Sequence, residues 1–328
     1  MRFLLLCLSF CPLVAQAIEP FTIRRIVPDE IDLAEVRLAQ PNFLVGTYAP
    51  IGPNRAMVWN NGEVSLLPGL GSNDSTADRN RSGVVVGYVS GNDTIYASRW
   101  INGQLELLRE NNDATDINDR GWIAGMGVRN WLLTEEGYTD IPTLPDLPGF
   151  YDIKGLSEDG LVAGDVIQHG GPAGSWAWTP NGGIVRLPFT EVMEVLDDGT
   201  VLGLRYGLWR NGEFLGRPLQ ISRGTNERGD IVGFDGNGGR ALYADGQIHY
   251  FSDLILPEVL AELTIYVAYD VNDARQILIE ANYRGEGGYW LLEPVPEPSA
   301  FMAFGLGIAA MAWRRRTRAS AGQVSQSA

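Results

Sequence analysis

A four-part pattern that returns about every 39 residues is the feature that most constrains the fold of this chain. Each copy opens with a short apolar run, which glycine brackets at Gly83–Gly87, Gly121–Gly125, Gly160–Gly164, Gly199–Gly203 and Gly229–Gly233. Less regular copies start at Asn42 and Ala274. A second run ends at or near an aromatic residue: Trp59, Trp100, Trp131, Trp178, Trp209, Tyr243 and Trp290. A fixed period of this length indicates a repeat architecture.

Turn signals separate the runs within each copy. Asn-Gly or Asp-Gly follows most of the aromatic residues, as at Asn61-Gly62, Asn102-Gly103, Asn211-Gly212 and Asp245-Gly246. These dipeptides mark two-residue hairpin turns, because both central positions need a positive φ. A third run follows, and a fourth ends in Asn-x-x-Gly, as at Asn80–Gly83, Asn118–Gly121 and Asn226–Gly229. Each copy therefore predicts four short antiparallel strands in roughly 40 residues.

A four-stranded unit of this length is typical of a β-propeller blade, so we predict an all-β fold with seven blades. The first two strands of the unit occur seven times, the last at Gln276–Asn282 and Tyr289–Glu293, and the other two six times. The missing pair stands before residue 42, at Phe21–Ile26 and Glu35–Leu38. We therefore expect the N-terminal and C-terminal strand pairs to close one blade, two strands from each. An open or two-layer β-solenoid is the alternative.

The N-terminus has the order of a secretory signal peptide. Arg2 is followed by an apolar stretch and then Ala15-Gln16-Ala17, which predicts cleavage between Ala17 and Ile18. Both cysteines, Cys7 and Cys11, lie within residues 1–17. The sequence therefore predicts an exported chain without disulfides.

The C-terminus predicts a membrane-targeting segment. Ala300–Trp313 is uncharged and mostly apolar, and Arg314, Arg315 and Arg316 follow at once as a stop signal. As a helix, this stretch would be somewhat shorter than the ~30 Å hydrocarbon core. We expect it to insert in the inner membrane with the arginines on the cytoplasmic side, before any processing. An ordinary C-terminal anchor is the alternative.

The order of Pro296-Glu297-Pro298, a brief apolar helix and an arginine cluster resembles the PEP-CTERM sorting signal of Gram-negative bacteria. The resemblance implies processing by an exosortase near Pro296–Pro298 and an address at the cell surface or outside it. The predicted domains are a signal peptide at 1–17, the propeller at 18–294, the sorting signal at 295–318 and a cytoplasmic tail at 319–328.

The repeat also resembles the HAF family of extracellular repeats, as at Ala114–Gly125. That family implies the fold and an extracellular address but no activity.

The net charge of the chain and its lack of catalytic motifs exclude several classes of function. Removing five arginines and one glutamate with the two ends lowers the formal charge from −15 to −19. A surface of this sign disfavours nucleic acid. With two histidines in the chain and none of the usual nucleophile, zinc or phosphate motifs, we predict no catalytic residue, metal or cofactor. We expect a non-catalytic binding or structural module associated with exopolysaccharide, biofilm matrix or another surface protein. A polysaccharide-acting hydrolase or lyase is the alternative.

The lengths of the connections select one face of the propeller. Connections from the first to the second strand, and from the third to the fourth, open on one face and are long and varied, whereas those of the other face are short turns. Recognition tends to use loops on a rigid scaffold, so we predict the varied face as the ligand face. Its candidate residues are Tyr48, Asp93, Asp146, His169, Asp235, Tyr283 and Arg284. The periodic tryptophans are predicted to pack in the core rather than to bind sugar.

Overall fold

The computed structural model describes residues 18, 20–26, 33–40, 43–48, 53–205 and 207–295. The predicted sorting motif, apolar helix and arginine stop, and all of the signal peptide up to Ala17, lie outside these residues. The chain divides into two units, Phe21–Glu293 and the two ends, Met1–Pro20 with Pro294–Ala328. In the described part of the chain, no helix is long and apolar enough to span a membrane.

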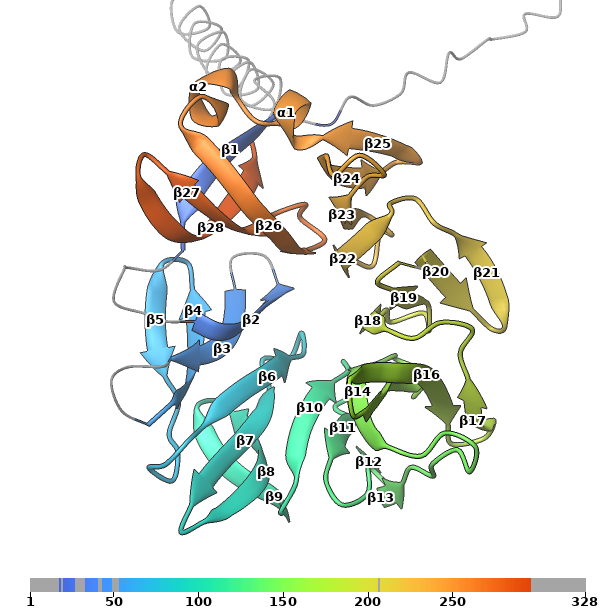
Figure 1. Ribbon diagram of the computed structural model, residues 1–328. Helices are drawn as coiled ribbons and strands as arrows, with labels where there is room; N and C mark the ends of the chain where they lie inside the picture. The colour runs from blue at the N-terminus through green and yellow to red at the C-terminus, as the bar shows by residue number, and fades with distance from the viewer. Residues whose placement is uncertain are drawn as a thin grey trace, which may run out of the picture. The chain divides into compact units, whose positions relative to one another are not determined.

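Within the described residues, the strands form seven four-stranded antiparallel sheets, as predicted (Figure 1). The first strand of each sheet lies nearest the axis: β2 (Leu33–Gln40), β6 (Ser75–Arg79), β10 (Asp113–Ile117), β14 (Phe150–Leu156), β18 (Val192–Val195), β22 (Ile221–Thr225) and β26 (Leu263–Val271). The second strands are β3 (Phe43–Tyr48), β7 (Val85–Gly91), β11 (Ile123–Met126), β15 (Val162–Gln168), β19 (Val201–Gly203), β23 (Ile231–Phe234) and β27 (Ile277–Tyr283). Each first strand contacts the first strand of the next sheet, and β26 contacts β2, so the sheets form a ring.

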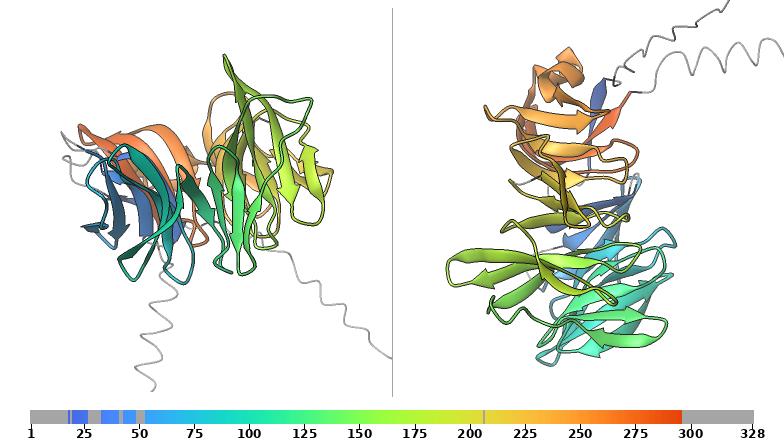
Figure 2. Two further views of the ribbon diagram at one scale, coloured as in Figure 1. Left: turned by 90° about the horizontal axis from the view of Figure 1, so that it is seen from below. Right: turned by 90° about the vertical axis from the view of Figure 1, so that its right-hand side faces the viewer.

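The third strands carry most of the repeated aromatic residues: β4 (Arg55–Asn60), β8 (Thr94–Ile101), β12 (Trp131–Thr134), β16 (Gly171–Thr179), β20 (Gly207–Arg210), β24 (Arg240–Ala244) and β28 (Glu286–Pro294). The outer strands are β5 (Glu63–Leu66), β9 (Gln104–Glu110), β13 (Gly137–Asp140), β17 (Gly183–Arg186), β21 (Glu213–Gly216), β25 (Gln247–Tyr250) and β1 (Phe21–Arg25). Two short helices, α1 (Phe251–Leu254) and α2 (Pro257–Leu260), connect β25 to β26. Figure 2 shows that the β15–β16 hairpin projects beyond the neighbouring sheets.

The repeated glycines meet two different backbone requirements. Gly83 is the fourth residue of the turn that joins β6 to β7, where it has a φ of 88° and its N–H donates to the carbonyl of Asn80 at 3.0 Å. Gly164 lies on β15 beside a register shift in β14, and a Cβ at this position would lie 1.9 Å from the carbonyl oxygen of Asp152. The first glycine of the repeat therefore makes the turn, and the second allows two strands to approach closely.

The core lies between the sheets. One cluster joins Val45 and Ala56 of the β2–β5 sheet to Val85 and Trp100 of the β6–β9 sheet, and similar clusters join later neighbours. The six repeated tryptophans, Trp59, Trp100, Trp131, Trp178, Trp209 and Trp290, are all buried. Their predicted role in the core is thus confirmed, and burial between sheets leaves none of them free to stack on a sugar.

The way the ring closes differs from the prediction in one respect. The closing sheet has the order β1-β28-β27-β26, so it takes three strands from the C-terminus and one from the N-terminus, not two from each. The predicted N-terminal pair is divided, because β2 is the first strand of the next sheet. The Asn-x-x-Gly turns join strands within a sheet, and the chain crosses to the next sheet after β1, β5, β9, β13, β17, β21 and β25. The boundary of the structural unit is therefore displaced by one strand from the boundary of the sequence unit.

Side chains and backbone together hold β1 in place. Phe21 is fully buried, and its carbonyl accepts a hydrogen bond from the N–H of Leu256 at 3.1 Å. Arg24 forms a bidentate ion pair with Glu293 of β28, with N···O distances of 3.0 and 2.9 Å. Arg25 pairs with Glu286 at 2.9 Å. A single strand thus completes the sheet through packing, hydrogen bonds and paired charges.

Replacing Phe21 with Ala is predicted to lower the free energy of unfolding by ~3–5 kcal/mol, the usual cost of removing a buried phenylalanine. Denaturant unfolding of the mature exported protein measures this. The matched control is Phe214→Ala on β21, where the side chain is 64% exposed and the expected change is within ~0.5 kcal/mol. Equal stability of the two variants would show that β1 does not close the ring.

Candidate functional site

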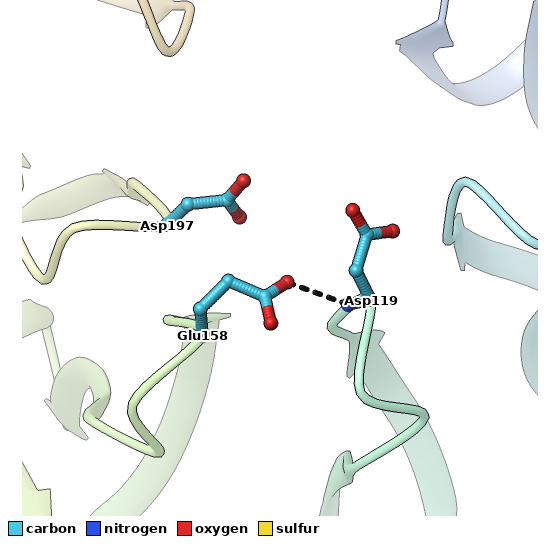
Figure 3. A group of neighbouring side chains, drawn as sticks. All are labelled: Asp119, Glu158 and Asp197. Atoms are coloured by element: carbon cyan, nitrogen blue, oxygen red, sulfur yellow. Dashed lines mark hydrogen bonds between the residues drawn. The ribbon is translucent and has the colours of Figure 1, made fainter.

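Acidic residues gather at one end of the axis, where a short turn joins the first and second strands of each sheet, which are the fourth and first strands of the sequence unit. The second residue of these turns is Asp119, Glu158, Asp197, Glu227 or Asp273, and we call these five the axial carboxylates. They line a cavity of about 390 Å³. Figure 3 shows Asp119, Glu158 and Asp197 extending from neighbouring turns toward a common space. The site thus lies on the face with short turns, opposite the predicted ligand face.

The axial carboxylates tie one sheet to the next. Four of them accept the backbone N–H of the second residue in the preceding turn: Arg81 to Asp119 at 2.7 Å, Asp119 to Glu158 at 2.6 Å, Asp197 to Glu227 at 2.9 Å and Glu227 to Asp273 at 3.1 Å. The separation along the chain is close to one repeat in each case. One carboxylate oxygen in these four residues is therefore committed to holding the ring together.

A parallel set of hydrogen bonds comes from the first residues of the turns. The side-chain amide of Asn80 donates to the carbonyl of Asn118 at 3.2 Å, and Asn118 donates to the carbonyl of Ser157 at 3.0 Å. Asn226 makes the same bond to Asn272 at 2.9 Å. All of these asparagines are buried, so each bond also satisfies a polar group that would otherwise be costly to bury.

Burial and mutual repulsion raise the pKa of two axial carboxylates. Burial is the largest cause for Asp197, followed by the charge of Glu158, and together they raise its pKa to about 6. Burial also leads for Glu227, with the charges of Asp197 and Asp273 adding to it, and its pKa rises to about 7. Glu227 is an exposed residue, but it lines the axial cavity, where protein replaces part of the surrounding water. Asp197 and Glu227 therefore bind their protons at a higher pH than ordinary carboxyl groups do.

Arg81 supplies positive charge to this acidic cluster. Its guanidinium lies 2.9 Å from Asp119 and 3.3 Å from Asp197, which belong to turns of different sheets. One oxygen from each of Asp119, Glu158 and Asp197 lies within 4.8 Å of the others, a spacing that could hold a divalent cation. The guanidinium already provides a cation to two of these carboxylates.

The predicted ligand face is built from loops of separate sheets. Tyr48 ends β3, Asp93 lies in the β7–β8 turn, Asp146 in the β13–β14 connection, His169 in the β15–β16 turn, Asp235 after β23, and Tyr283 and Arg284 at the end of β27. Among the described residues, no hydrogen bond or ion pair joins any two of these seven side chains, although the guanidinium of Arg284 lies over the Tyr283 ring at 5.0 Å. Their role in binding stays a prediction.

Several of these side chains instead stabilise their own surroundings. Asp235 accepts hydrogen bonds from the N–H groups of Asn237 and Gly239, at 2.8 and 2.6 Å, and from the hydroxyl of Tyr250 at 3.0 Å. These bonds lower its pKa, the bond from Gly239 most of all. Arg284 pairs with Glu262 at 2.5 Å. Both contacts fix the local loop conformation.

The sequence contained a signal for the axial site. Five of the six turns that the structure describes between first and second strands have an acidic second residue, and the sixth has Arg81. Asp119 and Glu158 are 39 residues apart, as are Glu158 and Asp197. Carboxylates repeated at the period of the fold must meet around the axis. The prediction missed them because it treated these turns as structural alone.

Comparison with known protein families identifies a motif at the C-terminus. Residues 294–316 match the PEP-CTERM protein-sorting motif. The motif implies export, processing by an exosortase, and a surface or extracellular location in a Gram-negative bacterium. Among curated proteins, none matches this sequence.

Solved structures similar to this chain include three that share little sequence with it. The β-propeller domain of the Trilobed protease from Pyrococcus furiosus has 12% identity and a TM-score of 0.39, over 83% of this chain and 85% of that one. TolB from Acinetobacter baumannii has 11% identity and a TM-score of 0.38, over 74% of this chain and 60% of that one. An arginine-to-alanine triple mutant of AofleA from Arthrobotrys oligospora has 10% identity and a TM-score of 0.37, over 85% of this chain and 91% of that one. At this level the likeness carries no argument, and the propeller rests on its own seven sheets.

Glu227→Gln is predicted to change how stability depends on pH. The folded protein binds the Glu227 proton more tightly than the unfolded chain does, so the contribution of Glu227 to stability is fully present below pH 4.5 and is lost as pH rises through about 7. The variant cannot ionise and should lose this dependence, with greater stability than the parent at pH 8. Denaturant unfolding at pH 5 and pH 8 measures the effect, with Glu136→Gln as an exposed control. A parent whose stability rises between pH 4.5 and 7 through Glu227 would contradict the assignment.

Arg81→Gln is predicted to make the axial carboxylates depend on an added cation. Without the guanidinium, Asp119, Glu158 and Asp197 repel one another, so the melting temperature should fall at pH 7 and recover with millimolar calcium. The control is Arg99→Gln, which breaks an ion pair with Glu106 between β8 and β9. Thermal melting with calcium or with EDTA compares the variants. The same calcium response in the parent and both variants would refute a balancing role for Arg81.

Proposed function

We propose that the protein is a non-catalytic binding module that is displayed at the cell surface or in the extracellular matrix and associates with exopolysaccharide. The sorting motif supports the address, because it implies export and processing by an exosortase. The propeller supports binding, because it holds many connecting loops on a rigid frame. The HAF-like repeat is consistent with an extracellular address and stays a prediction.

The position of the motif supports display of the propeller itself. β28 ends at Pro294, where the matched motif begins, and the N–H of Val295 donates to the carbonyl of Pro20 at 2.7 Å. Processing near Pro296–Pro298 would therefore leave the closing sheet whole. We infer that the released or attached product retains all seven sheets.

The observation that most favours a non-catalytic role is the bonding of the axial carboxylates. Glu158, Glu227 and Asp273 each accept a backbone N–H from the neighbouring turn, and Asp119 and Asp197 both pair with Arg81. A general acid or nucleophile needs free access to a substrate atom, and these groups are engaged in holding the sheets together. The acidic ring is thus explained by the architecture.

A hydrolase or lyase acting on polysaccharide is a second candidate, and one observation favours it. Asp119, Glu158 and Asp197 bring carboxylate oxygens within 4.8 Å, and the pKa of Asp197 is raised to about 6. Glycosidases pair a protonated with an ionised carboxyl group at roughly this kind of separation. In this alternative, Asp197 would act as the acid.

A binding and turnover experiment separates the two candidates. The mature exported protein is incubated with exopolysaccharide from its own host, and both co-sedimentation and released reducing or unsaturated ends are measured. We expect co-sedimentation with no release of ends, and an unchanged result for Asp197→Asn. Release of ends that Asp197→Asn abolishes would establish the enzyme. If the protein neither bound the polysaccharide nor released ends, both candidates would be rejected.

Removal of the sorting segment tests the address. A chain that lacks residues 296–328 keeps all the described strands, so it should fold and appear as a soluble protein in the medium. Fractionation of cells that express either form, followed by immunoblotting, measures its distribution. If the shortened chain were retained at the surface like the full chain, the sorting segment would not determine its location.

A further inference from the structure

A second cavity lies on the opposite face from the axial carboxylates, between the β10–β13 and β14–β17 sheets. Three segments line it: residues 127–130 between β11 and β12, residues 140–143 after β13, and residues 149–151 at the start of β14. Its volume is about 480 Å³, within the range of ~300–1,000 Å³ usual for small-molecule sites. We call it the Phe150 pocket. It belongs to the face that the connection lengths had selected, and Asp146 lies in one of its flanking connections.

Hydrogen bonds fix the walls of the Phe150 pocket. The side-chain amide of buried Asn130 donates to the carbonyl of Tyr151 at 2.7 Å, and the carbonyl of Asn130 accepts the N–H of Ile141 at 2.8 Å. The hydroxyl of Tyr151 donates to the carbonyl of Leu147 at 2.8 Å and accepts the N–H of Leu144 at 2.7 Å. All three lining segments are thus joined by direct bonds, so the pocket is formed before any ligand arrives.

Phe150 gives the pocket an exposed aromatic surface. Its side chain is 54% exposed, although it stands next to buried Tyr151. Two other exposed aromatic residues have polar partners elsewhere, since Tyr138 donates to the carbonyl of Leu108 and Tyr250 donates to Asp235. An exposed phenylalanine inside a preformed cavity provides an apolar plane that matches the carbon-bound hydrogens on one face of a pyranose ring.

The pocket also offers polar and charged groups. Arg129 lies 3.5 Å from Asp140, and both line the cavity together with the exposed Thr143. A guanidinium, a carboxylate and a hydroxyl supply donors and acceptors for sugar hydroxyl groups. The rest of the mature chain carries a net charge of −19, which repels an acidic polymer. Asp140 also pairs with Arg109 at 3.3 Å, so the carboxylate in the wall is neutralised, and the acidic surround favours a ligand that carries no negative charge.

We propose that the Phe150 pocket binds a neutral sugar residue of a polysaccharide, with Phe150 stacked on the ring and Arg129 and Asp140 bonded to its hydroxyl groups. The proposal rests on the proposed association with exopolysaccharide and assigns it a place on the molecule. It concerns binding alone, since the pocket has a single carboxylate within its walls, Asp140, among the residues described.

Direct binding measurements on matched variants test the proposal. Phe150→Ala and Phe214→Ala both remove an exposed phenylalanine, at 54% and 64% exposure, but only Phe150 lines the pocket. The mature exported protein and both variants are titrated with a panel of neutral oligosaccharides prepared from glucans, mannans and galactans. The parent and Phe214→Ala should bind at least one member equally. Phe150→Ala should bind it at least tenfold more weakly, with an unchanged melting temperature.

A second variant distinguishes the polar contacts from the stacking. Arg129→Ala should weaken binding of the same oligosaccharide, whereas Arg99→Ala, which lies on β8 outside the pocket, should not. Equal affinity of Phe150→Ala and the parent would overturn the proposal, as would a parent that binds no member of the panel and no host exopolysaccharide. In the latter case the proposed function fails as well.

The two proposals can fail separately. If Phe150→Ala still sediments with host exopolysaccharide as the parent does, the pocket is not the binding site and the proposed function survives. If the parent binds a neutral oligosaccharide through Phe150 but ignores host exopolysaccharide, the pocket stands and the association with exopolysaccharide is wrong.

Discussion

Closure of the ring by one N-terminal strand is the constraint on which the rest of this structure depends. A strand at the edge of an open sheet exposes unpaired backbone groups, and β1 covers that edge of β28 while β26 contacts β2 of the next sheet. The N–H of Leu38 on β2 donates to the carboxylate of Asp270 on β26 at 3.0 Å. The same kind of bond joins other neighbouring first strands, as from Leu156 to Asp116 at 3.0 Å. Closure therefore brings all the axial turns to one place.

Most of the fold could be predicted because its cause is local and repeated. Asn61 and Asn102 have φ values of 50° and 51°, as the hairpin turns that they mark require, and Trp59 is fully buried. The division of the closing sheet could not be read in the same way. Each repeat contains four strands in cyclic order, so the sequence does not say which of the four junctions lies between sheets. The length of a connection does not decide this either, since the crossing from β9 to β10 has only two residues, Asn111 and Asn112.

The two sites differ in how far the sequence could indicate them. The axial carboxylates recur with the period of the fold, so knowledge of the ring alone is enough to bring Asp119, Glu158 and Asp197 together. The Phe150 pocket depends on an irregular connection between two particular sheets, with walls joined by Asn130 and Tyr151. Such contacts follow no repeat, and the sequence predicted only the face on which they lie. Residues that recur with the repeat thus form the ring of sheets, whereas residues outside the repeat form the Phe150 pocket.

Hydrogen–deuterium exchange of the mature exported protein tests ring closure most directly. The amides of β1, Phe21–Arg25, that pair with β28 should be protected from exchange to the same degree as the paired amides of another outer strand, such as β5, Glu63–Leu66, because both strands complete a sheet. Exchange of all β1 amides at the rate of an unstructured peptide, together with fast exchange of the β28 amides that point away from β27, would contradict a closed ring of seven sheets.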